Sequence, residues 1–365
     1  MIDTCLFREK NLWHHLAETS LPITIYGMGN GADKILAELE KRKIEVADFF
    51  ASDGFVRGHS FHGKRVLSFS EVKEKYENFI ILLAFGSSLS DVMARIYDIA
   101  DQHELYAPDV PVCGGPLFDA EFYLANKDQF DRVREFLADE KSKEVYDNLI
   151  SYKLSGDISY LAHADTEKDT ALTEILSGGY TAYADLGAYN GDTIRETLAY
   201  FPTVKRITAF EPSPKTFAKL MRYLDTVEGV ALSPFNLCAG DKAETVALTD
   251  GSGRNTAIGA GADTKTKSGA VVHTSACDSL DNRCDYKGEK LFIKYDVEGA
   301  EKEAILGSEK TIMNNETDLL VSLYHKSEDL FSLPLMLREK LPDHKFYLRK
   351  HPYIPAWDIN LYVVK

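Results

Sequence analysis

The segment YADLGAYNGDTIRE, residues 183–196, has the residue types and order of a ligand-binding turn. An apolar run is followed by Gly187 and Gly191, which let the backbone bend and approach a ligand without an intervening Cβ. Asp192 and Thr193 then stand where a helix would begin, so that main-chain N–H groups point outward beside acceptor side chains. We therefore predict a strand, a turn and a helix start that form part of a cofactor site.

Carboxylates end this apolar run and the next one. Asp185 closes the first, and RITAF (206–210) leads into Glu211, which lies 20 residues after Gly191 (211 minus 191). That is about the spacing at which a strand–helix–strand unit brings a carboxylate to the ribose of a bound nucleotide. We predict that Glu211 accepts hydrogen bonds from two ribose hydroxyls, and that Asp185 orients the turn or holds an ammonium group.

Three further segments place polar turns after apolar runs. FEPSPKTF (210–217) sets Pro212 directly after the carboxylate, FNLCAGD (235–241) ends in a turn, and LFIKYDVEGAE (291–301) leads into an acidic turn. In open α/β sheets, ligands bind outside the carboxyl ends of the strands. The sequence therefore predicts that these turns meet at one edge of a sheet.

The ordered set DLGAYNGDT, FEPSP, NLCAGD, SLD and IKYDVEGAE resembles the FkbM-type S-adenosylmethionine-dependent methyltransferases, and the later YHKSEDLFSLP and FYLRKH resemble the end of that family. The likeness covers residues 120–365. One departure is that the family's glycine turn often reads GANxG, whereas this chain has Tyr189 in the place of the Asn. The resemblance implies S-adenosylmethionine as cofactor, held by Asp185, Gly187, Ala188, Asn190, Gly191, Asp192, Thr193, Glu211, Pro212, Cys238 and Ala239.

The acidic turn contains the candidate catalytic groups. Methyl transfer to a hydroxyl needs an acceptor lone pair in line with the methyl carbon, exclusion of water and a base for the proton. We predict that Asp296 lies near the transferred methyl group and that His325 is the base. Glu298 and Glu301 remain alternatives, although acids also favour a helix N-terminus. No metal ion is predicted, because nothing in the sequence determines a ligand set, although a metal bound by the acid cluster remains an alternative.

The predicted class is α/β: a class I methyltransferase with a Rossmann-like, mostly parallel sheet, preceded by a smaller Rossmann-like α/β domain and a helical connector. The predicted boundaries are residues 1–117, 118–161 and 162–365. In the first domain, the turn GMGNG (27–31) could cradle a diphosphate, with Asp53 contacting a ribose. This domain resembles the sugar-nucleotide-binding domain that precedes some sugar-modifying enzymes.

Two other segments could contact an acceptor. Residues 249–269 are rich in Gly, Thr and Ser and predict a mobile loop over the site. Arg254 and Asn255 in this loop could hold a polar acceptor, as could Arg349, Lys350 and His351 near the end of the chain.

Composition limits the partners. The chain has 365 residues and a net charge of -15, which disfavours nucleic acid. The apolar run at 79–85 is far shorter than the ~20 residues of a membrane span, and the amino terminus lacks the plan of a secretion signal. Five cysteines without a CxxC pair predict neither disulfides nor zinc. We expect a cytoplasmic location, and a homodimer is compatible with the sequence.

The predicted function is O-methylation of a hydroxyl on a sugar or another small polar metabolite, free or joined to a carrier, with N-methylation left open. One alternative is a dinucleotide-dependent oxidoreductase, because both halves begin with a glycine turn. Another is a non-catalytic sugar-nucleotide-binding protein. Relative affinities for NAD and S-adenosylhomocysteine would distinguish the first alternative, and a binding protein would transfer no methyl group.

Overall fold

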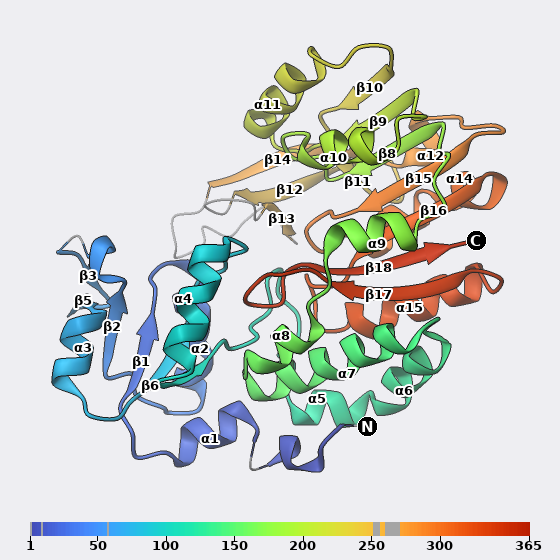
Figure 1. Cartoon of the computed structure of the whole chain (residues 1–365). Helices are drawn as coiled ribbons and strands as arrows, with labels where there is room; N and C mark the ends of the chain where they lie inside the picture. The colour runs from blue at the N-terminus through green and yellow to red at the C-terminus, as the bar shows by residue number, and fades with distance from the viewer. Residues whose placement is uncertain (1, 9, 57, 251–255, 260–270) are drawn as a thin grey trace.

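Two α/β units lie beside each other and a group of helices joins them (Figure 1). The structure is a computed structural model that describes residues 2–8, 10–56, 58–250, 256–259 and 271–365. One buried apolar cluster includes side chains of both units and of the joining helices. No helix within these ranges has both the length and the apolar character needed to cross a membrane.

The amino-terminal unit is built on a five-stranded, fully parallel sheet in the order β5-β2-β1-β6-β7. Its central strands read as continuous apolar runs and are fully buried, as expected for a parallel sheet. Its elements are η1 (Thr4–Phe7), α1 (Leu12–Glu18), β1 (Ile23–Tyr26), α2 (Asn30–Lys41), β2 (Asp48–Ala51), η2 (Asp53–Phe55), β3 (Ser60–Phe61), β4 (Lys64–Arg65), β5 (Leu67–Ser68), α3 (Phe69–Lys75), β6 (Ile80–Leu83), α4 (Ser90–Ala100) and β7 (Glu104–Tyr106).

Five helices follow and pack on the carboxy-terminal unit. The central one, α7, begins after Asp139, whose side chain caps it, and ends at Gly156 in a left-handed conformation (φ 68°). The buried Tyr146 hydroxyl donates to the Leu330 carbonyl at 3.0 Å, which ties α7 to the far end of the chain. The helices are α5 (Ala120–Ala125), α6 (Lys127–Phe136), α7 (Glu140–Ser155), α8 (Ser159–Ala164) and α9 (Lys168–Glu174).

The carboxy-terminal unit contains a seven-stranded sheet in the order β10-β9-β8-β15-β16-β18-β17. β18 runs antiparallel to both of its neighbours, and the other pairs are parallel. This mostly parallel α/β architecture confirms the predicted fold class. Its strands are β8 (Ala182–Leu186), β9 (Arg206–Phe210), β10 (Ala231–Phe235), β15 (Lys290–Tyr295), β16 (Glu316–Ser322), β17 (Lys345–Lys350) and β18 (Ile359–Val364). Its helices are α10 (Asp192–Tyr200), α11 (Pro214–Leu224), α12 (Leu280–Arg283), α13 (Glu301–Leu306), α14 (Glu309–Asn314) and α15 (Asp329–Lys340).

The register of three strands determines where the predicted site residues emerge. Leu186 at the end of β8 pairs with Phe210 of β9 on one side and with Tyr295 of β15 on the other. All three strands therefore end at the same level of the sheet, and the turns that follow them meet at one edge. The first residues of these turns are Gly187, Glu211 and Asp296.

A smaller sheet, in the order β11-β14-β12-β13, interrupts the alternation between β10 and β15. Its strands are β11 (Cys238–Ala239), β12 (Glu244–Asp250), β13 (Thr256–Gly259) and β14 (Val271–Asp278). The loop predicted at 249–269 thus contains a strand that pairs with β12. Arg254 and Asn255, predicted as acceptor contacts, lie outside the described residues.

Candidate functional site

A cavity of about 670 Å³ is lined by residues of both α/β units. One wall comes from the carboxyl ends of β8, β9 and β15, including Gly187, Glu211 and Asp296. Across from it, the amino-terminal unit contributes residues of its own glycine turn, such as Met28 and Gly31, together with Lys34. The volume falls within the range of small-molecule sites, about 300–1,000 Å³.

The glycine turn after β8 leaves no room for side chains at two positions. Gly187 has φ 94°, and a Cβ there would lie 1.8 Å from the carbonyl oxygen of Asp296. Gly191 has φ 86°, and its Cβ would lie 2.4 Å from Cδ1 of Tyr223. Between them, Tyr189 adopts a left-handed backbone (φ 46°), which is strained for a non-glycine residue, and lines the cavity. The turn therefore requires glycine at these two positions, because the backbone has a positive φ there and other parts of the protein lie too close for a Cβ.

Glu211 places a buried carboxylate in the cavity wall, with only 7 % of its surface exposed. The backbone N–H of Ser213 donates to its Oε1 at 2.8 Å, which orients the carboxyl group. Burial raises the pKa of Glu211 to about 7, because the charged form loses hydration. Hydroxyl groups of a ligand could donate hydrogen bonds to this carboxylate in place of the water molecules that burial removes.

A buried lysine links two acids of the site. Asp185 and Lys294 are partners in the register of β8 and β15, and Lys294 Nζ lies 3.4 Å from Asp185 Oδ1 and 3.4 Å from Asp296 Oδ2. Burial alone would lower the pKa of Lys294, but the two carboxylates raise it above its ordinary value. Burial would raise the pKa of Asp296, but Lys294 and His325 hold it at about 2. Asp296 is thus kept ionised.

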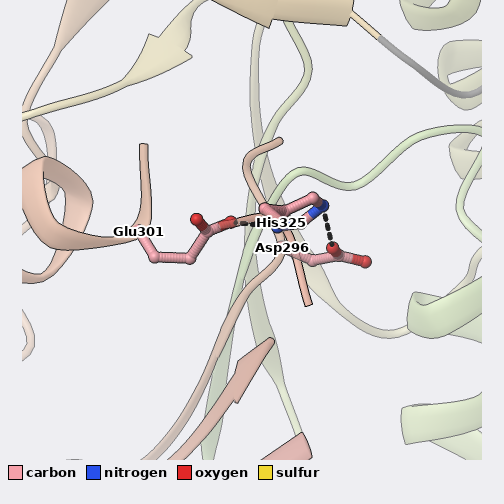
Figure 2. Close-up of side chains that lie close together, drawn as sticks. All are labelled: Asp296, Glu301 and His325. Atoms are coloured by element: carbon pink, nitrogen blue, oxygen red, sulfur yellow. Dashed lines mark ion pairs between the residues drawn. The ribbon is translucent and has the colours of Figure 1, made fainter. Parts of the chain in front are cut away.

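His325 is fully buried and surrounded by carboxylates (Figure 2). Its Nδ1 lies 2.9 Å from Glu301 Oε1, and its Nε2 lies 3.3 Å from Glu298 Oε2. The same Nε2 is 3.6 Å from Asp296 Oδ1. Burial would lower the pKa of His325, but Glu301 and Glu298 raise it well above its ordinary value. Among the described residues, Asp296 and Glu298 line the cavity, whereas His325 lies behind them.

The structure brings most of the predicted cofactor residues to one place. The cavity wall includes Gly187, Asp192, Thr193, Glu211, Pro212, Cys238 and Ala239. The remaining four lie in or beside the turn, outside the described lining. Asp185 and Ala188 are fully buried, Asn190 Oδ1 accepts from the backbone N–H of Asp192 at 3.2 Å, and Gly191 precedes α10.

Residues 349–351, considered as acceptor contacts, serve a different purpose. Arg349 pairs with Asp139 at 2.6 Å, and the buried Lys350 pairs with Asp165. His351 Nδ1 contacts the carbonyl oxygen of Thr166 at 2.9 Å. These side chains join β17 and the residue after it to the connecting helices, so the expectation of an acceptor contact is wrong for them.

Asp53, considered as a ribose ligand in the first unit, also has another partner. It is exposed, and Ser70 donates to it through its backbone N–H at 3.1 Å and through its hydroxyl at 2.7 Å. Asp53 therefore orients the first turn of α3, and it lies outside the described cavity lining.

Sequence reasoning missed several lining residues. Lys294 had a signal, because it stands two positions before Asp296 and so points to the same face of β15. No sequence signal pointed to Tyr353 and Trp357, because they lie in an irregular segment between β17 and β18. They reach the cavity because Ile354 forms an antiparallel bridge with Ser87 of the amino-terminal unit, with N–O distances of 2.8 and 3.0 Å.

Strand order, the single antiparallel strand β18 and the glycine turn after the central strand β8 define a fold of the class I methyltransferase type. Residues 185–348 match the model of the methyltransferase FkbM domain. The chain thus contains an FkbM methyltransferase domain, which confirms the predicted family.

One solved structure has the same fold along the whole chain. The methyltransferase FkbM from Methylobacillus flagellatus KT is 17% identical and superimposes with a TM-score of 0.70, covering 99% of this chain and 94% of that one. An rRNA methylase from Streptococcus thermophilus is 13% identical and superimposes with a TM-score of only 0.32, covering 53% of this chain and 91% of that one. No curated protein matches the sequence.

Proposed function

We propose that the protein transfers the methyl group of S-adenosylmethionine to a hydroxyl of a sugar or another small polar metabolite, free or joined to a carrier. The family match supports methyl transfer as the reaction class. The observation that favours this nucleoside cofactor is Glu211, a buried carboxylate in the wall of a cavity that also contains the glycine turn.

The residues present fit the cofactor. Gly187 and Tyr189 of the glycine turn line the cavity beside Glu211, whose carboxylate offers two oxygens to ribose hydroxyls. Cys238 and Ala239 are buried and supply an apolar part of the wall. Bound there, S-adenosylmethionine supplies an electrophilic methyl group.

The acidic turn then positions the acceptor. Asp296 lies on the cavity wall and is held by Lys294 Nζ at 3.4 Å and by the Tyr324 hydroxyl at 2.9 Å. Its carboxylate accepts a hydrogen bond from the acceptor hydroxyl and directs the oxygen lone pair toward the methyl carbon. His325 was the predicted base, but its pKa is raised well above the ordinary value, so the ring already carries a proton. The alternative Glu298 lines the cavity and burial raises its pKa, so we propose that Glu298 accepts the proton of the hydroxyl.

Calorimetric titration with S-adenosylhomocysteine tests the cofactor assignment. We expect clear binding by the native chain and about ten- to hundredfold weaker binding by Glu211→Ala, because a charge-assisted hydrogen bond contributes about 1.5–3 kcal/mol. Glu228→Ala removes an exposed carboxylate near the end of α11 and is the matched control, with unchanged affinity expected. Equal affinity of native and Glu211→Ala proteins would contradict the ribose assignment.

Two further measurements separate the alternatives. Tighter binding of NAD than of S-adenosylhomocysteine would favour a dinucleotide-dependent oxidoreductase. Transfer of a labelled methyl group to members of a panel of sugars, sugar nucleotides and carrier-linked sugars would support the acceptor class. Cofactor binding without transfer to any member would favour a sugar-nucleotide-binding protein.

A further inference from the structure

We propose that a divalent transition-metal ion binds among Asp296, Glu301 and His325, beside the proposed methyl-transfer cavity (Figure 2). One potential ligand atom from each side chain lies within 4.8 Å of those from the other two. Two carboxylates and an imidazole suit first-row cations such as Mn²⁺ and Zn²⁺ better than Ca²⁺ and Mg²⁺, which prefer oxygen ligands alone.

The imidazole of His325 lacks the partners that a buried ring normally has. The side chain is fully buried, and neither ring nitrogen makes a hydrogen bond to any residue that the structure describes. Both nitrogens nevertheless lie 2.9–3.6 Å from carboxylate oxygens. These nitrogen–oxygen distances are close to those of hydrogen bonds, but the angles at the ring nitrogens are not those of hydrogen bonds. Because buried polar atoms are almost always paired, this side chain points to a missing ligand.

Glu301 shows the same deficiency independently. Only 1 % of its surface is exposed, and its Oε1 accepts from the backbone N–H groups of Val297 at 2.9 Å and Gly299 at 3.4 Å. Its Oε2 is buried without a hydrogen-bond partner in the described part of the chain. An unpaired buried carboxylate oxygen is costly, and a cation would satisfy it.

The separations suit a shared ion. Ligand atoms that lie about 2.0–2.2 Å from one metal ion are separated from each other by roughly 3–3.5 Å. Only one ring nitrogen can bind a given ion. If Nδ1 binds it, Glu301 Oε1 at 2.9 Å is the neighbouring ligand and Asp296 supplies the third ligand atom of a set that lies within 4.8 Å. Nε2 then faces Glu298 at 3.3 Å, which orients the ring, as is usual for metal-bound histidines.

Charge and backbone strain agree with a cation. Glu298 adds a third carboxylate, 3.3 Å from His325 Nε2, and adopts a strained left-handed backbone at φ 56°. Lys294 offsets one of these negative charges, and a protonated His325 offsets a second; the ion would take the place of the ring proton, which is released to solvent. Since Asp296 and Glu298 also line the cavity, the ion would lie where it could bind an acceptor hydroxyl and increase its acidity. This catalytic role rests on the proposed function, whereas binding of the ion does not.

Titration of the metal-free full chain with Mn²⁺, followed by electron paramagnetic resonance, tests the site. We expect saturable binding of one ion per chain, unaffected by excess Ca²⁺, and about tenfold or greater weakening in Glu301→Gln and in His325→Gln. Glu303→Gln makes the same charge change at an exposed position of α13 and should bind Mn²⁺ as the native chain does. No saturable binding by the native chain, or equal binding by all three variants, would overturn the proposal.

Two controls keep the outcome interpretable. Mn²⁺ should raise the Tm of the native chain, and this shift needs no variant to fold; an unchanged native Tm at saturating Mn²⁺ would count against the site. S-adenosylhomocysteine is titrated into the same metal-free samples. If it binds and Mn²⁺ does not, the ion site alone is wrong; if Mn²⁺ binds and the nucleoside does not, the proposed cofactor is wrong and the ion site stands.

Discussion

The two glycine turns of this protein occupy equivalent positions but are surrounded differently. Each follows a central parallel strand, β1 or β8, and each leads into a helix, α2 or α10. In both, a glycine lies against a neighbouring segment: a Cβ on Gly31 would be 2.2 Å from the Ala84 carbonyl oxygen, and one on Gly187 would be 1.8 Å from that of Asp296. Both turns line the same cavity.

The difference lies in the acid that follows the next strand. Glu211 is buried in the cavity wall, whereas Asp53 is exposed and accepts hydrogen bonds from Ser70. A glycine turn therefore shows only that the backbone must approach something closely. Whether a ligand also binds there depends on the surrounding side chains. Of the two acids compared, only Glu211 is buried beside its turn, and it is the group that we propose for the ribose.

The largest effect is expected for Gly187→Ala. The new Cβ would overlap the Asp296 carbonyl in a backbone conformation that disfavours L side chains, so we expect a loss of about 3 kcal/mol in the free energy of unfolding and no detectable binding of S-adenosylhomocysteine. Chemical denaturation and calorimetry measure the two effects.

Gly31→Ala provides the comparison. Its clash with Ala84 should also lower the free energy of unfolding. The folded protein should keep native affinity for S-adenosylhomocysteine within about twofold, because all the proposed cofactor contacts lie on the opposite wall of the cavity, in the carboxy-terminal unit. At Gly54 a Cβ would meet nothing within 4 Å, so Gly54→Ala should change neither quantity. Native affinity in Gly187→Ala would show that the second turn is not the cofactor turn.

A smaller effect is expected from pH. Burial raises the pKa of Glu211 to about 7, with further contributions from Asp185 and Glu298, so the carboxyl group of the ligand-free protein gains a proton as the pH falls below 7. Ribose hydroxyls donate to the ionised form. Affinity for S-adenosylhomocysteine should therefore be constant above pH 7 and fall by up to about tenfold per unit below it.

Calorimetry between pH 5.5 and 8 measures this dependence. Glu211→Gln should bind more weakly at every pH but lose the decline below pH 7, because the amide does not titrate. A native affinity that is equally strong at both ends of the range would remove the argument for an ionised ribose acceptor.

Much of the second unit was predictable because local pattern and tertiary structure agree there. The apolar runs that end at Asp185, at Phe210 before Glu211, and at Tyr295 form adjacent parallel strands in register, so the turns meet as expected. Asp296 was predicted directly after β15, and the alternation of side chains along that strand would also have indicated Lys294, which sequence reasoning missed.

Other features depend on contacts between distant segments and have no local signal. The cavity has two walls because Ser87 pairs with Ile354 and because the connecting helices pack on β17. The same packing places Arg349 in an ion pair with Asp139, although its charge had suggested a substrate contact. The complete burial of the His325 side chain was likewise not predictable, because the sequence around it does not indicate that carboxylates surround the ring.

The smallest effect is expected for Asp53→Ala. The side chain accepts two hydrogen bonds from Ser70 at the start of α3, but it is exposed, so their removal should lower the free energy of unfolding by only about 0.5–1 kcal/mol. Affinities for S-adenosylhomocysteine and for NAD should not change, because a carboxylate engaged in orienting a helix is not available to a ribose. If instead NAD binds the native chain and Asp53→Ala weakens it, the first turn is a nucleotide site, and the contrast between the two turns would have to be reversed.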